Sequence, residues 1–194
     1  MRVRVLGSAA GGGVPQWNCR CEVCDAARAG VRARPRTQSS LAEWQPLEPG
    51  RVTRLAGSSL SLEPFSAGGD ADGFVFRDRA GDGVVAYVPV LARWDDGVRG
   101  RLATSDLALV DGTFWRDDEL ARLGISPRSA REMGHVPLSG PDGTLATLAR
   151  LERPRKALVH INNTNPILLE DSPEREAVLR ADVEVADDGL EIEL

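Results

Sequence analysis

The chain has 194 residues, of which 42% are hydrophobic and 27% charged, a composition typical of a folded globular protein. Its formal net charge of −5 argues against a general nucleic-acid-binding protein, which needs a basic face to neutralise phosphates. No apolar run is long enough to cross a bilayer, and the first residues lack the apolar core of a signal peptide. We therefore expect a cytoplasmic protein with one domain over residues 1–194 and no membrane partner.

In the first half of the chain, β-branched and aromatic runs separated by glycine and proline predict mostly strands. A helix is expected at residues 22–29, and a connector without a clean period at 43–56. Strands are expected at residues 3–6, 39–42, 60–65, 73–77 and 84–90, with a hairpin over 74–88.

The second half alternates between helix and strand patterns, which is typical of the α/β or mixed class. Ser172 and Pro173 have the residue types of a helix N-cap and first turn, so they predict a helix start. Asp187-Asp188-Gly189 predicts a hairpin between residues 183–185 and 190–192. The other expected elements are helices at 91–103, 115–123 and 143–151 and strands at 107–111 and 157–161.

The strongest motif holds all three cysteines of the chain within Cys19-Arg20-Cys21-Glu22-Val23-Cys24. This C-x-C-x-x-C spacing lets three thiolates reach one point, and zinc prefers soft sulfur ligands in a tetrahedral set of four. The odd number and tight grouping argue against a disulfide framework. We predict a structural metal site that takes its fourth ligand from elsewhere in the chain; three buried, inert thiols are the alternative.

Three other residues have side chains suited to a functional site. His160 ends an apolar strand, and Asp111 ends a buried strand in the same way. Because α/β folds place their sites at strand ends, we predict a ligand role for His160, with a core histidine bonded to backbone as the alternative. Asp111 is interpreted as a metal ligand, a general base or a turn residue. His135, in a glycine-flanked loop, is either a general acid or base or a surface histidine.

Two classes of hydrolase lack their motifs in this sequence. The G-x-S-x-G elbow of serine hydrolases does not occur. No H-x-H pair occurs either, so a dinuclear site built on histidine pairs cannot form from this chain alone.

Several strings of the sequence are long and unusual, namely residues 5–13, 15–19, 35–40, 110–119, 131–135, 138–141, 160–168 and 171–175. They resemble the pyrroloquinoline quinone (PQQ) biosynthesis protein B family, a branch of the metallo-β-lactamase superfamily. The resemblance covers residues 1–42 and about 84–194. It implies an αββα sandwich of two mixed sheets with helices outside, here partly truncated.

The resemblance also implies roles for particular residues. The family's cysteine cluster binds a structural zinc, and we take His160 as its fourth ligand here. Related phosphodiesterases use a histidine slightly downstream, which corresponds to the neighbourhood of Asn163. In related ribonuclease Z-like enzymes the counterpart of His160 binds the catalytic metal and that of His135 is a catalytic acid or base. The two roles for His160 therefore compete.

One departure from the family bears directly on activity. The family's central block includes an aspartate–histidine metal motif, whereas residues 43–58 of this chain contain no histidine. The resemblance implies a role in making PQQ, either iron-dependent hydroxylation of a tyrosine-derived precursor or transport of the product. Oxygen activation at iron needs several nitrogen or oxygen ligands and open positions. The ligands that could replace the missing motif are Asp111, His135 and His160.

Our first hypothesis is thus a protein of PQQ biosynthesis with a structural zinc and a pocket that binds PQQ or its peptide-derived precursor. The pocket is expected to include Asn162 and Asn163; if the protein is active, Asp111 and His160 hold a metal and His135 moves protons. The alternative is a shortened, non-catalytic relative that binds the precursor, the quinone or a partner protein. A third hypothesis is a phosphodiesterase, but the missing histidine pairs argue against it.

Shortening a sandwich has a physical consequence for assembly. Lost strands expose sheet edges and apolar surface, which favours pairing with another chain. We expect a homodimer or a complex with another protein of the PQQ pathway.

Overall fold

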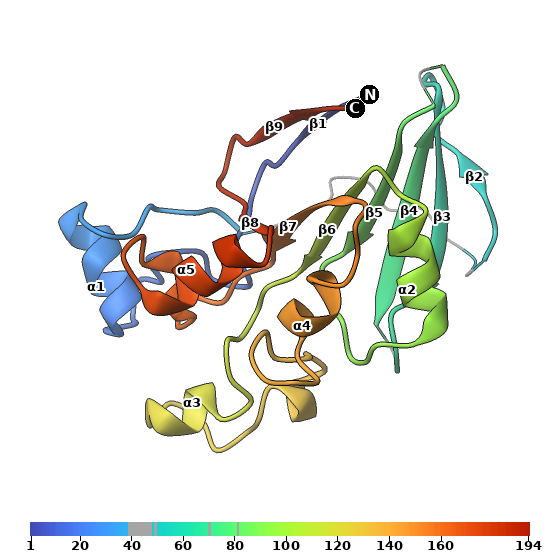
Figure 1. Cartoon of the computed structure of the whole chain (residues 1–194). Helices are drawn as coiled ribbons and strands as arrows, with labels where there is room; N and C mark the ends of the chain where they lie inside the picture. Colours follow the sequence, from blue (N-terminus) through green and yellow to red (C-terminus); the bar gives the residue numbers. More distant parts are fainter. Residues whose placement is uncertain (39–47, 49, 70, 81) are drawn as a thin grey trace.

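The computed structural model describes residues 1–38, 48, 50–69, 71–80 and 82–194 (Figure 1). Nine strands of this part form a seven-stranded sheet, in the order β2-β3-β4-β5-β6-β7-β8, and a two-stranded sheet, β1-β9. The strands are β1 (Arg2–Arg4), β2 (Thr53–Arg54), β3 (Leu60–Ser66), β4 (Asp72–Asp78), β5 (Val84–Val88), β6 (Leu107–Asp111), β7 (Arg155–Val159), β8 (Glu184–Val185) and β9 (Glu191–Glu193).

Short helices connect the strands in the second half of the chain. Within the described residues, no helix combines the length and the apolar character needed to span a membrane. The α-helices are α1 (Glu22–Ala29), α2 (Asp96–Ala103), α3 (Glu119–Arg122), α4 (Thr144–Leu148) and α5 (Pro173–Arg180), and the 3₁₀-helices are η1 (Arg131–Met133) and η2 (Pro166–Leu168). The predicted mixed α/β class is confirmed.

The large sheet changes direction at β5. Strands β2 to β5 pair antiparallel, and β5 to β8 pair parallel. Parallel strands are covered on both faces, so their sequences are continuous apolar runs. Strand β6 fits this pattern, because all of its residues are buried. Because β6 and β7 are parallel, with Asp111 paired to Val159, their carboxyl ends meet at one edge of the sheet.

The two faces of the large sheet carry different cores, because side chains alternate along a strand. Ala108 and Val110 of β6 join the core on the helix side, which also contains Leu102 of α2 and Leu148 of α4. Leu107 and Leu109 face the other way, into a smaller core that β1 and β9 cover. Residues of this smaller core include Val5, Val85, Ala157, Val159, Ala186 and Ile192.

Three predicted helices, including the one expected at 143–151, are shorter than expected, and before two of them side chains form turns. The helix expected at 91–103 begins only at Asp96, since Asp95 is its N-cap and accepts a hydrogen bond from Val98 N at 2.9 Å. The helix expected at 115–123 is confined to α3. Here Glu119 Oε2 accepts from Trp115 N at 2.7 Å, which holds the preceding residues in turns.

The hairpin predicted around Asp187-Asp188-Gly189 is wrong. Strand β8 pairs parallel with β7, and β9 pairs antiparallel with β1, so the two segments belong to different sheets. Each segment finds a partner that buries its apolar residue, Val185 beside Leu158 and Ile192 beside Val3. The expected connector at 43–56 contains β2, and the strand expected at 39–42 lies outside the described residues.

Candidate functional site

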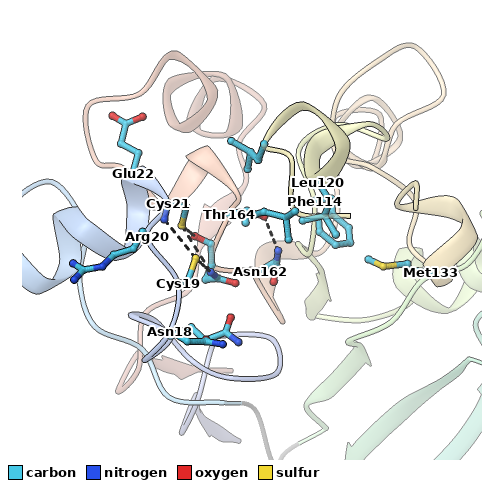
Figure 2. Close-up of a pocket in the computed structure, with 14 residues that line it drawn as sticks. Asn18, Cys19, Arg20, Cys21, Glu22, Phe114, Leu120, Met133, Asn162 and Thr164 are labelled. Atoms are coloured by element: carbon cyan, nitrogen blue, oxygen red, sulfur yellow. Dashed lines mark hydrogen bonds between the residues drawn. The ribbon is translucent and has the colours of Figure 1, made fainter. Parts of the chain in front are cut away.

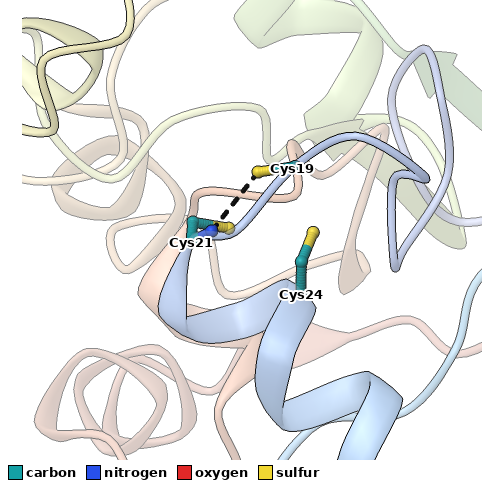
Figure 3. A group of neighbouring side chains, drawn as sticks. All are labelled: Cys19, Cys21 and Cys24. Carbon is teal, nitrogen blue, oxygen red and sulfur yellow. Dashed lines mark hydrogen bonds between the residues drawn. The ribbon is translucent and has the colours of Figure 1, made fainter.

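The three cysteines converge as predicted, because a loop and the first turn of α1 place them around one point. Cys21 is the residue before α1, and Cys24 lies in its first turn. The three Sγ atoms lie within 4.8 Å of one another and point toward a common space (Figure 3). A tetrahedral zinc with bonds of about 2.3 Å holds its sulfurs roughly 3.8 Å apart. The cluster therefore needs only a small contraction to fit zinc.

The thiols of this cluster differ in acidity. Burial raises the pKa of Cys21 to about 12, and its Sγ donates to the carbonyl oxygen of Asn163 at 3.3 Å. Burial also opposes ionisation of Cys19, but hydrogen bonds to its sulfur, beginning with the one from Cys21 N, outweigh burial and lower its pKa. Of these two thiols, Cys19 is thus the one that more readily supplies a thiolate to an incoming metal.

The group that faces the sulfurs is the amide of Asn163, and not His160. Asn163 Nδ2 lies 3.1 Å from Cys19 Sγ, 3.4 Å from Cys24 Sγ and 3.8 Å from Cys21 Sγ. Turning the amide by half a rotation would direct Oδ1 toward the same point. The prediction of His160 as the fourth ligand gains no support, because its ring stacks on His135 instead, with ring centroids 5.9 Å apart.

A buried carboxyl holds the loop that presents Asn163. Thr164 Oγ1 donates to Glu119 Oε1 at 2.5 Å, and Asn162 Nδ2 donates to Thr164 Oγ1 at 2.6 Å. Burial raises the pKa of Glu119 above its ordinary value. Sequence reasoning missed Glu119, because within the acidic string Asp117-Asp118-Glu119 it has the pattern of a solvated helix start.

A second group of side chains meets where β6 and β7 end. The carboxylate of Asp111 has no exposed surface, and the side chain of His135 is 12% exposed. His135 Nδ1 lies 2.8 Å from Asp111 Oδ2. The His135 ring also makes an edge-to-face contact with Phe114, with centroids 5.7 Å apart, and stacks on His160. The structure thus brings the three predicted catalytic residues together.

Asp111 is fully occupied as a hydrogen-bond acceptor. Besides His135, its Oδ2 accepts from Leu91 N at 2.8 Å, and its Oδ1 accepts from Thr113 N at 2.9 Å and Thr113 Oγ1 at 2.5 Å. Among the described residues, only the cysteines form a group of three metal-ligating side chains within 4.8 Å. The role expected for Asp111 as a metal ligand with His160 stays a prediction, and the hydrogen bonds that Asp111 accepts compete with it.

His160 lies in a left-handed backbone conformation with φ of 55°, directly after β7. Burial lowers the pKa of its imidazole, an effect that Asp111 opposes and His135 reinforces. The folded state therefore favours the neutral ring, whereas the unfolded chain takes up a proton at about pH 6.5. Acid should consequently destabilise the fold through this residue.

We expect the free energy of unfolding to decrease as the pH is lowered below about 6.5. The decrease should be less steep in His160→Asn. Asparagine tolerates the left-handed backbone, so the variant isolates the titration from strain. Urea unfolding between pH 5 and pH 8 measures both slopes. Equal slopes for the two proteins would contradict this assignment.

A cavity of about 740 Å³ borders the cysteine cluster (Figure 2). One wall carries the half-exposed Cys19 and Cys21 together with polar side chains, and the other is apolar. Asn162 and Thr164 lie between the two walls. The apolar wall consists of Phe114, Leu120, Leu123, Ile125 and Met133.

Comparison with known proteins identifies the class to which this fold and site belong. The model of the β-lactamase superfamily domain matches residues 5–161. A diphosphatase from the PhnP family shares the fold, with a TM-score of 0.58 and 14% identity over 100% of this chain and 97% of that chain. The chain belongs to the β-lactamase superfamily.

Proteins with higher sequence identity to this chain identify its family within the superfamily. A coenzyme PQQ synthesis protein B from Cupriavidus necator is 34% identical over 99% of each chain, and one from Pseudomonas syringae pv. syringae is 33% identical over 100% of each. Zn²⁺-bound PqqB from Methylobacterium extorquens has a TM-score of 0.90 and 30% identity, with both chains covered completely. Within the superfamily, the chain is a member of the coenzyme PQQ synthesis protein B family.

The relatives contain internal segments that this chain lacks. The alignment with the Cupriavidus protein runs over 302 positions, against 194 residues in this chain, and still spans 99% of both. The shortening inferred from the sequence is therefore confirmed.

Proposed function

We propose that this chain acts in the synthesis of coenzyme PQQ and that it does so as a zinc-binding protein. The observation that carries this proposal is the match to family members along the whole of both chains. The donor set supports the metal, because three cysteine sulfurs within 4.8 Å are the ligands that zinc prefers. The small molecule on which the chain acts would be PQQ or its peptide-derived precursor.

The zinc would be held by the three cysteines, with the amide oxygen of Asn163 as the fourth donor. Its role would be to join the loop before α1 to the loop after β7, two segments far apart in the sequence. A metal bound only by the folded state adds its binding free energy to folding.

The chemistry that the Asp111–His135 pair supports is proton transfer. Asp111 already accepts hydrogen bonds from backbone amides, so it is the carboxylate form that accepts the Nδ1–H of His135. The basic nitrogen of the imidazole is then Nε2. We infer that His135 Nε2 takes or delivers a proton on the precursor, with Asp111 orienting the ring.

Iron-dependent hydroxylation, which the sequence resemblance implies, does not fit the residues described here. It needs several nitrogen or oxygen ligands and open positions. Asp111 accepts from two backbone amides and lies against His135 Nδ1, and no second group of three metal-ligating side chains assembles in the described parts of the chain. The proposal therefore contains no hydroxylation step.

In a bacterium that lacks its own PQQ synthesis protein B, we expect this chain to restore PQQ, measured by mass spectrometry of the culture. His135→Gln should lower the yield by about a hundredfold or more, since a positioned acid or base contributes that much. Arg131→Gln is the matched control, because this residue is exposed in η1, shortly before His135. Absence of PQQ with the unmodified chain would refute the proposed function.

A further inference from the structure

The cysteine cluster is shielded on only one side. Cys24 is completely buried, whereas Cys19 and Cys21 are half-buried and line the 740 Å³ cavity (Figures 2 and 3). A metal between the three sulfurs would therefore face the protein interior through Cys24 and the cavity through the other two. Structural zinc sites are normally closed on all sides by four strong ligands.

The fourth coordination position of this site would be filled by a weak ligand. Asn163 offers a neutral amide, while the strong zinc ligands of proteins are thiolate, imidazole and carboxylate. Glu22 is the carboxylate in the cavity wall, but its Oε1 is paired with Arg32 Nη1 at 2.8 Å. No carboxylate or imidazole of the described residues lies within 4.8 Å of all three sulfurs. An incoming ligand would have to displace only an amide.

The opposite wall of the cavity is suited to an aromatic ring. Phe114 and Met133 offer ring and thioether surfaces that favour aromatic neighbours. Leu123 and Ile125 remain 50% and 52% exposed, so a ligand here would remove apolar surface from water.

The charge at the metal position determines which kind of donor atom an incoming ligand can offer. Three thiolates around a divalent zinc carry a net charge of −1, and the chain itself has a net charge of −5. An anionic donor atom at the metal would meet repulsion from the thiolates, with Arg20 as the cation of the cavity wall, whereas a neutral nitrogen of an imidazole or pyridine ring would meet none. Such a ring combines a nitrogen donor that zinc accepts with a flat apolar body.

We propose that the metal held by Cys19, Cys21 and Cys24 keeps an exchangeable fourth position, and that this position binds a neutral aromatic nitrogen ligand from the cavity. The site is then a ligand-binding metal centre as well as a structural cross-link. This inference rests on the zinc-binding part of the proposed function and is independent of the role in PQQ synthesis.

The test uses the full chain loaded with cobalt(II), whose visible absorption reports the donor set of a tetrahedral thiolate site. One cobalt per chain, established first, verifies the cysteine site by itself. Imidazole and 4-phenylimidazole are then titrated. Both should change the spectrum while cobalt stays bound, and the phenyl compound should bind about tenfold more tightly, because its ring covers the apolar wall.

Variants separate this inference from its alternatives. Asn163→His should bind cobalt and no longer respond to either probe, because an imidazole closes the fourth position. Leu123→Ala should lose the advantage of 4-phenylimidazole and keep the response to imidazole. Leu179→Ala is the matched control, an equally exposed leucine on α5.

Three results would overturn the inference: no spectral change with either probe, the same change in Asn163→His, or removal of cobalt by the probe. Failure of the chain to bind cobalt at all would instead refute the zinc site of the proposed function.

Discussion

Cys24→Ser is expected to lower the zinc affinity of the chain by more than about a hundredfold. Cys24 is the fully buried member of the cluster, so no water can replace its sulfur from outside. Loss even of an outer-shell partner costs about 10–100-fold in metal affinity, and loss of a direct ligand costs more. Each tenfold loss of zinc affinity also lowers the free energy of unfolding of the zinc-bound protein by about 1.4 kcal/mol at saturating metal. Elemental analysis and competition with a chelator measure the affinity.

The matched control for this variant is Asn162→Ala. Asn162 is adjacent to Asn163 and lines the same cavity, but its amide bonds to Thr164 and not to a sulfur. It should retain zinc. Zinc bound by Cys24→Ser with unchanged affinity would show that the cluster is not the metal site.

Asp111→Ala is expected to destabilise the protein by about 3–5 kcal/mol, because each buried donor that loses its acceptor costs about 1–3 kcal/mol. The substitution leaves two backbone amides and the His135 ring without their acceptor, while the hydroxyl of Thr113 keeps the carbonyl oxygen of His160 as an acceptor. Asp111→Asn retains one acceptor oxygen and should cost less. Urea unfolding at constant pH measures these differences.

Asp118→Ala serves as the comparison, because this carboxylate is about half exposed and its ion pairs lie at the surface. It should change the unfolding free energy by less than about 0.5 kcal/mol. A loss smaller than about 1 kcal/mol in Asp111→Ala would mean that the carboxylate is not the organising group of this strand end.

The convergence of the three cysteines could be predicted from the sequence because it is local. Cys19, Cys21 and Cys24 lie within one loop and one helical turn, so their convergence depends on little else. The meeting of Asp111 and His160 could also be anticipated, because parallel strands bring their carboxyl ends to one edge. Both inferences follow from residue spacing and strand direction alone.

The fourth group at the sulfurs and the support behind it could not be predicted in this way. Asn163 is 139 residues from Cys24 in sequence and reaches it only after β7 has packed beside β6. Glu119 looks like a solvated helix residue until the fold buries it against Thr164. Similarly, Asp187-Asp188-Gly189 has hairpin chemistry, but long-range pairing of its flanking strands prevails over the local turn signal.

The pairing of β1 with β9 has a consequence for the order in which the molecule assembles and opens. Val3 and Ile192 are almost a full chain length apart, so closing their ladder costs loop entropy that local contacts do not offset. The large sheet, built from strands nearer in sequence, can form without it. We therefore expect the β1–β9 ribbon to form late and to open early, so that Arg2–Arg4 and Glu191–Glu193 fray together.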